Sequence, residues 1–224
     1  MTAVNTIVSK RTPHNREALL DPVGSFWKGS SSTIITLLPT PLGQQPSLYV
    51  RYAEKEFGKI KKIDIKSAHN GEDIFFNLEW FVDKPVTRMS EESPFVDAAG
   101  ILIPMKHDAP HMIMVSMGSE AYEVNAWYWR ADEPDNPRNV WAKGLGTTVT
   151  SKQSFLFSRA VLTGNIWNVV IGRKMQLPEQ KDHAVQLLPG IKTLVSFAAW
   201  AGANQERGGI KGFCPAPIEL IIEA

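Results

Sequence analysis

One stretch of the chain combines a candidate ligand for a soft metal with an unusual number of aromatic residues. Residues 112–129 read MIMVSMGSEAYEVNAWYW, in which Met117 stands beside a glycine and a polar turn separates two apolar halves. A thioether sulfur binds soft metals, and the glycine lets another molecule approach the backbone closely. In the second half, Trp127 and Trp129 alternate with smaller residues and share a face with Asn125. This pattern indicates either a sandwich core or a pocket for a large, flat, apolar ligand.

A second stretch begins with a lysine. Lys192 opens the segment KTLVSFAAW, and the alternate positions after it are small or apolar: Leu194, Ser196, Ala198 and Trp200. A lysine at the head of such a face either extends its ammonium to water at the sheet edge or is neutral and bound to something. Coordination to a metal requires the unprotonated amine, so a metal would favour the second interpretation. The residues alone leave both open.

Other residue types that commonly carry catalysis are poorly placed for it. His107 and His111 are four residues apart, but Pro110 between them argues against a helix that presents both to zinc. His69 lies in a predicted turn, where histidine is usually a surface residue. The chain has no GxSxG motif, no GxGxxG motif and no phosphate-binding loop. Hydrolase chemistry is therefore poorly supported.

Length and composition indicate one domain over residues 1–224. The hydrophobic fraction of 43% is enough for a core, and 16 glycines with 15 prolines indicate many turns. A formal charge of +1 with scattered basic residues favours neither nucleic-acid nor polybasic membrane binding. The single cysteine, Cys214, excludes an internal disulfide, an iron–sulfur cluster held by this chain alone and a two-thioether haem attachment. Any haem here is therefore expected to be b-type.

Alternating apolar residues between turn signals predict an all-β fold, an antiparallel β-sandwich with long loops and one or two short helices. The clearest strand spans 73–82, and the turn 69–71 (His-Asn-Gly) is predicted to join it to the preceding strand in a hairpin. Residues 83–109 are predicted to be irregular, 178–188 helical, and 1–30 an extended N-terminal arm. The other predicted strands are 33–38, 48–53, 59–66, 112–117, 122–129, 147–150, 155–162, 165–173, 192–200 and 217–223.

Three of these segments resemble the haem b-binding gamma subunits of ethylbenzene dehydrogenase and related molybdoenzymes of the type II DMSO reductase family. They are VSMG at 115–118, VNAWYW at 124–129 and FAAWAGANQER at 197–207, and the resemblance covers roughly residues 15–223. The same family includes the gamma subunits of dimethylsulfide dehydrogenase, of selenate and chlorate reductases and of steroid C25 dehydrogenases.

The resemblance implies a β-sandwich that holds one haem b non-covalently. Met117 and Lys192 would be the axial ligands of the haem iron. The other residues that the resemblance places at the cofactor are Asn125, Trp127, Trp129 and Trp200. If the ligand pair is not this one, then His69, His107 or His111 becomes the candidate.

The resemblance also implies an electron-transfer subunit that is not catalytic alone. It would take electrons from an iron–sulfur beta subunit, in a heterotrimer whose alpha subunit carries a molybdenum cofactor and hydroxylates a hydrocarbon or sterol. A soluble acceptor such as a cytochrome would receive the electrons. The alternative is a non-haem ligand-binding sandwich such as a carbohydrate-binding module, with Trp127, Trp129 or Trp200 as stacking platforms.

The N-terminal twenty residues contain no apolar run of signal-peptide length, and no window reaches the roughly 18 apolar residues of a membrane span. By resemblance, we expect a periplasmic protein that is exported together with the alpha subunit. It would be cytoplasmic if the complex is not exported.

Overall fold

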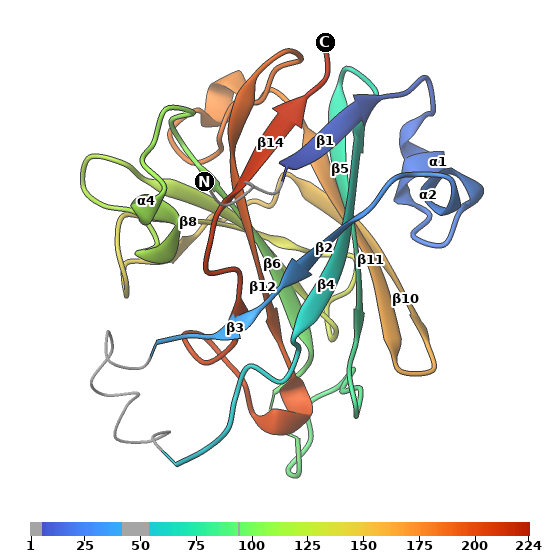
Figure 1. The fold of residues 1–224 in the computed structure, drawn as a ribbon, viewed down its shortest axis with the longest axis vertical. Helices are drawn as coiled ribbons and strands as arrows, with labels where there is room; N and C mark the ends of the chain where they lie inside the picture. Colours follow the sequence, from blue (N-terminus) through green and yellow to red (C-terminus); the bar gives the residue numbers. More distant parts are fainter. Residues whose placement is uncertain (1–5, 42–53, 94) are drawn as a thin grey trace.

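The computed structural model describes residues 6–41, 54–93 and 95–224, and it confirms an all-β sandwich (Figure 1). The strand predicted at 48–53 lies outside these residues. The strands are β1 (Thr6–Arg11), β2 (Thr33–Thr36), β3 (Leu38–Pro39), β4 (Lys62–His69), β5 (Asp73–Phe81), β6 (Ala98–Pro104), β7 (Val124–Arg130), β8 (Arg138–Ala142), β9 (Val149–Thr150), β10 (Leu156–Thr163), β11 (Ile166–Lys174), β12 (Lys192–Trp200), β13 (Gly212–Phe213) and β14 (Ile218–Ile222). They run in the order β10-β11-β5-β4-β1-β14-β12-β6-β7-β8-β9, with β2 beside β4 and with β13 between β12 and β3.

The N-terminal segment is built into the sandwich and is not an extended arm. Strand β1 pairs in parallel with β14 on one side and with the end of β4 on the other, so it links the two layers (Figure 1). The short helices α1 (Arg16–Leu20) and α2 (Ser25–Lys28) follow it, and their buried Leu19 and Trp27 pack on the outer face of the β5 layer. Burial of these apolar side chains is what holds the segment in place.

The predicted hairpin between β4 and β5 is confirmed. The Asn70 side-chain oxygen accepts from the backbone N–H groups of Glu72 at 3.0 Å and Asp73 at 2.8 Å. Gly71 has a φ of +95°, a conformation that glycine adopts without steric cost. The strands on either side then pair from His69 and Ile74 outward.

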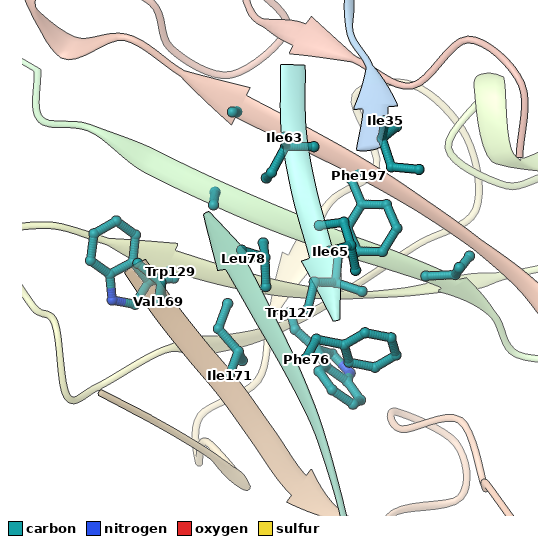
Figure 2. Packing of buried hydrophobic residues seen from close by; sticks show 14 of the residues in the cluster. Ile35, Ile63, Ile65, Phe76, Leu78, Trp127, Trp129, Val169, Ile171 and Phe197 are labelled. Atoms are coloured by element: carbon teal, nitrogen blue, oxygen red, sulfur yellow. The ribbon is translucent and has the colours of Figure 1, made fainter. Parts of the chain in front are cut away.

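The main core lies between the two layers and consists of every second residue of the paired strands. Trp127 and Phe76, from facing sheets, meet edge to face with ring centroids 5.7 Å apart, and Phe76 meets Phe197 at 6.2 Å. Figure 2 shows these rings together with Ile65 and Leu78 in the same interior. The period-two pattern of each strand therefore sorts its residues into a core face and an outer face.

Three predicted elements differ from the structure. Residues 112–117 are not a strand: they begin with the short helix α4 (Met112–Val115), whose N-cap is His111. The excursion 83–109 contains β6, which is buried along its whole length between β7 and β12 and so lacks the alternation of a half-exposed strand. Only Pro178–Gln180 of the segment 178–188 is helical, as one 3-10 turn.

Candidate functional site

A pocket of about 430 Å³ lies on the outer face of the layer formed by β12, β6, β7 and β8. Its floor consists of the outward-facing residues of these strands: Ser196, Ala198, Gly100, Leu102, Ala126, Tyr128 and Val140. These are the positions that alternate with the core residues of the same strands. The volume and the mainly apolar lining are typical of a site for a small molecule.

Met117 forms part of one wall of the pocket, next to Met114 and Val115 of helix α4. Its φ of 59° is in the left-handed region, which a non-glycine residue adopts only when its surroundings require it. Two backbone bonds fix the turn: Gly118 N–H donates to the Ile113 carbonyl at 2.9 Å, and Gly144 N–H donates to the Met117 carbonyl at 2.9 Å. The thioether is thus held at the pocket by a rigid turn.

Gly118 makes this turn possible. A β-carbon at this position would lie 2.7 Å from the carbonyl oxygen of Ala142, closer than side-chain carbons approach a backbone oxygen. Its φ of +95° also favours glycine. The sequence predicts that another molecule approaches the backbone closely at this glycine. In the structure, the backbone of strand β8 makes this close approach, and the contact fixes the Met117 turn.

Lys211 contributes an amine to the same pocket from a different segment of the chain. Its Nζ donates to the Gly208 carbonyl at 3.3 Å and lies 5.2 Å from the centre of the Trp200 ring. Burial lowers the pKa of Lys211 to about 8, because desolvation disfavours the ammonium. Lys211 therefore loses its proton more easily than an exposed lysine does, and the neutral amine is the form that binds a metal.

The loop 201–211 that carries Lys211 is anchored by a buried carboxylate. Glu206 is 1% exposed and accepts from the backbone N–H groups of Ala201 and Lys59, both at 2.9 Å, and from the Asn204 side chain at 3.0 Å. A carboxylate that accepts several N–H bonds is a strong local anchor. Trp200 Nε1 also donates to the Gly208 carbonyl at 3.0 Å, which ties the loop to the pocket floor.

Asp97 fixes the beginning of the same loop. Its carboxylate accepts from Gly202 N–H at 2.8 Å, Val86 N–H at 3.0 Å and Trp167 Nε1 at 2.9 Å. Burial raises the pKa of Asp97, while these three hydrogen bonds oppose that shift. A β-carbon on Gly202 would lie 2.5 Å from the Phe95 carbonyl oxygen, so the backbone contact requires glycine there. The motif AWAGANQER thus builds the loop that presents Lys211.

The anchor gives a first prediction. Glu206→Gln places an amide donor against backbone N–H groups and leaves one of them unsatisfied, so the free energy of unfolding should fall by about 1–3 kcal/mol. Urea denaturation at constant m-value measures the loss. Glu219→Gln is the matched control, because Glu219 is partly exposed and its contact with Lys192 is 4.0 Å long; its effect should stay within about 0.5 kcal/mol. Equal losses in both variants would contradict the anchoring role.

Lys192 does not lie at this pocket. Its side chain is 65% exposed at the start of β12, with Nζ 4.0 Å from the Glu219 carboxylate. It shares the pocket-facing side of the strand with Ser196, as the alternation predicts, but it stands four residues away, roughly 13 Å along the strand. The structure therefore brings Lys211, and not Lys192, to the pocket that contains Met117.

Three of the predicted cofactor-contacting residues lie on the opposite face of β7. Trp127 and Trp129 are fully buried in the core between the layers. Asn125, also fully buried, donates to Asn139 Oδ1 at 2.8 Å and accepts from Val185 N–H at 3.3 Å, so it joins β7 and β8 to the segment before β12. The three residues build the layer behind the pocket without lining it.

Trp200 is the predicted aromatic residue that does line the pocket. Its ring packs edge to face against Tyr128, with centroids 5.3 Å apart, and it covers Gly100, where a β-carbon would touch the ring at 3.4 Å. The lysine on its face and the hydrogen bond of its Nε1 hold the ring in one orientation. It therefore forms a fixed wall.

The histidines considered from the sequence are not at the pocket. His69 is fully buried in the core, and desolvation lowers its pKa. His107 shares a hydrogen bond of 2.9 Å with the Gln186 carbonyl, and His111 is exposed before helix α4. Within the described ranges, no three His, Cys, Asp or Glu side chains gather into a potential metal site.

The pocket therefore offers a soft thioether and an amine of lowered pKa from two separate wall segments, above an apolar floor. Such a donor set fits an iron macrocycle: Met117 and Lys211 would hold the metal, and the apolar floor would contact the flat ring. The residues around Lys211 do not single it out in the sequence, because it lies in a glycine-rich loop without the alternation of a strand. Its signal was its position just after the AWAGANQER motif.

Comparison with solved structures shows the fold. The chain superimposes on a family 9 carbohydrate-binding module from Caldicellulosiruptor kristjanssonii, solved with glucose, with a TM-score of 0.55, 9% identity, and coverage of 98% of this chain and 96% of the other. Three tryptophans of this chain were candidates for stacking on a sugar. Two of them, Trp127 and Trp129, are 0% exposed and cannot reach a sugar. No helix in the described part of the chain is long and apolar enough to span a bilayer.

Sequence relatives are gamma or haem subunits by name. The chain is 29% identical to the chlorate reductase gamma subunit of Ideonella dechloratans over 85% of this chain and 74% of the relative. It is 27% identical to the dimethylsulfide dehydrogenase gamma subunit of Rhodovulum sulfidophilum over 90% and 72%. It is 31% identical, over 68% of this chain and 53% of the relative, to the proposed heme subunit (ORF7) of a respiratory nitrate reductase of Haloferax mediterranei.

The family model described as ethylbenzene dehydrogenase matches residues 24–161, more than half of the sequence. That span contains the Met117 turn, its locking glycine and strands β6 to β8 of the pocket floor. The chain therefore belongs to the ethylbenzene dehydrogenase family, as the resemblance of its motifs predicts.

Proposed function

We propose that this chain is the haem-binding electron-transfer gamma subunit of a molybdoenzyme complex, with Met117 and Lys211 as the axial ligands of one haem b. The observation that carries the proposal is that these two side chains, 94 positions apart in the sequence, line the same apolar pocket. The names of the relatives, which include gamma subunits and a haem subunit, support the same class of function.

Each residue has a separate task. Met117 supplies a thioether from a turn whose geometry is fixed before the ligand arrives. Lys211 supplies the amine, and Trp200 holds its side chain at the pocket wall through the contact with the ring face. When bound, the haem supplies one-electron redox chemistry, and a thioether ligand favours a high reduction potential. The apolar floor limits the access of water to the iron site.

The proposed partners follow from the family. An iron–sulfur beta subunit would deliver electrons, an alpha subunit with the molybdenum cofactor would act on a hydrocarbon or sterol, and a soluble acceptor such as a cytochrome would receive the electrons. The family description supports the hydrocarbon part of this proposal. We further propose that the complex acts in the periplasm, after export together with the alpha subunit.

Haem titration of the purified full chain tests the function. Ferric protoporphyrin IX should bind one to one and give a low-spin absorption spectrum, with sharp α and β bands after reduction by dithionite. Calorimetry with glucose and cellotriose should show no binding. A chain that binds no haem, or that binds these sugars in its place, would support the carbohydrate-binding alternative that the fold likeness raises.

A further inference from the structure

The pocket has one rim that is richer in polar donors than the other. Tyr128 of the floor lies next to this rim, on β7, and Thr148 and Thr150 line the rim at strand β9. The opposite rim, near β3 and β13, consists of Pro41, Phe213, small residues around Lys211, and Thr40, whose hydroxyl already donates to the Lys211 carbonyl at 3.2 Å. A ligand with charged groups on one edge would therefore find different chemistry at the two rims.

The hydroxyl of Tyr128 has no hydrogen-bond partner among the described residues, although its ring is packed against Trp200. Burial raises the pKa of Tyr128, and the nearby Arg130 and Arg138 act in the opposite direction. The phenol is therefore a neutral donor at neutral pH. Both guanidinium groups lie within electrostatic range of it, on the same face of the sheet.

The two arginines differ in how fully they are engaged. Arg130 makes two bonds to Asp132, from Nε at 2.9 Å and from Nη2 at 2.6 Å, in a partly buried pair. Arg138 uses only Nη2, which contacts both Glu133 oxygens at 2.8 and 2.9 Å, and this pair is more than a third exposed. Exposed ion pairs contribute little stability. Arg138 therefore keeps Nε and Nη1 available for another anion.

Arg138 is also the residue directly opposite Tyr128 in the β7–β8 register. Val140, two positions further along β8, lines the pocket floor and pairs with Thr150 of the rim. Tyr128, Arg138 and Thr150 thus occupy neighbouring positions on one surface of the sheet. A guanidinium and hydroxyl donors at such spacing suit a carboxylate.

We propose that Tyr128 and Arg138 form a carboxylate subsite at the β8–β9 rim, with the hydroxyls of Thr148 and Thr150 beside them, that binds the propionate groups of the porphyrin and fixes its orientation. The inference rests on the proposed haem function. It concerns only the carboxylate groups of the porphyrin, while Met117 and Lys211 would hold the iron.

The test compares two ligands on the full chain: ferric protoporphyrin IX and its dimethyl ester, which keeps the macrocycle and iron but removes both negative charges. The native chain should bind the free acid roughly tenfold to a hundredfold more tightly, the range of hydrogen bonds to charged groups. Tyr128→Phe and Arg138→Gln should each reduce this preference, and the double variant should bind the two ligands within roughly threefold of each other, since only the hydroxyl donors remain.

Arg159→Gln is the matched control, because Arg159 also forms an exposed ion pair, with Glu17 at 2.7 Å, but lies on β10 in the other layer of the sandwich, away from Tyr128. It should retain the full preference. Equal binding of the two ligands by the native chain, or an unchanged preference in a double variant with native circular dichroism, would overturn the subsite while leaving haem binding intact. Failure of the native chain to bind either porphyrin would instead overturn the haem function itself, and the subsite with it.

Discussion

Lys211→Ala should change the haem of the reconstituted protein from low-spin to high-spin, or abolish stable haem binding. The pocket offers the iron two protein ligands from different walls, and removal of one leaves five-coordinate iron or a site open to water. Loss of a direct metal ligand should weaken binding by at least the 10–100-fold typical of the residues that merely support ligands. The absorption spectrum and a haem titration, both at fixed pH, measure the two effects.

Lys192→Ala is the matched control for that experiment. The same residue type is removed, but from an exposed position whose contact is with Glu219. We expect an unchanged low-spin spectrum and unchanged haem affinity. Met117→Ala should reproduce the result of Lys211→Ala, because it removes the other proposed ligand. If Lys192→Ala causes the spin-state change and Lys211→Ala does not, the assignment of Lys211 is wrong, and Lys192 must reach the iron in the assembled complex.

Trp127→Ala should lower the free energy of unfolding by about 3–5 kcal/mol, the cost of truncating a fully buried tryptophan. The ring is 0% exposed and packs against Phe76, and the Arg173 guanidinium lies 5.2 Å from its centre. Its removal leaves a cavity between the two layers that surrounding residues can fill only in part. Urea denaturation followed by tryptophan fluorescence and by circular dichroism measures the change.

Trp141→Ala provides the comparison for the core variant. Trp141 is on strand β8, is only partly buried and stacks on His183 with centroids 5.4 Å apart. Its truncation removes less contact and should cost clearly less stability. A Trp127→Ala protein as stable as the native chain would show that the ring does not support the core, and it would restore the interpretation of Trp127 as a binding platform.

Much of the fold can be predicted from local sequence, because a half-buried strand alternates apolar and polar residues. Strand β12 has the predicted bounds, and the β4–β5 hairpin follows from its Asn-Gly turn. The prediction of a strand at 112–117 was wrong. Four apolar residues in a row suit one helical turn as well as a strand, and only tertiary packing decides between the two. Strand β6 was missed because burial on both faces removes the alternation.

The candidate site was predictable only in part, for a related reason. Alternation correctly placed Lys192 and Trp200 on one side of β12, but it says nothing about how far along the strand a pocket extends. That extent is set by helix α4 and by the loop of Lys211, which come from distant parts of the sequence. Likewise, the aromatic residues around Trp127 pack in the core behind the pocket floor. Sequence alone does not show whether such residues support the pocket from behind or contact its ligand.

The parallel pairing of β1 with β14 has a consequence for how the chain is made. These strands are separated by more than 200 residues, so their contact is strongly non-local. On the ribosome, β1 emerges long before β14 and lacks this partner until about 200 further residues have been made. Folding of the complete sandwich should therefore be slow and should wait for β14, with an unpaired strand edge exposed until then. Such an exposed edge is a site at which nascent chains can aggregate.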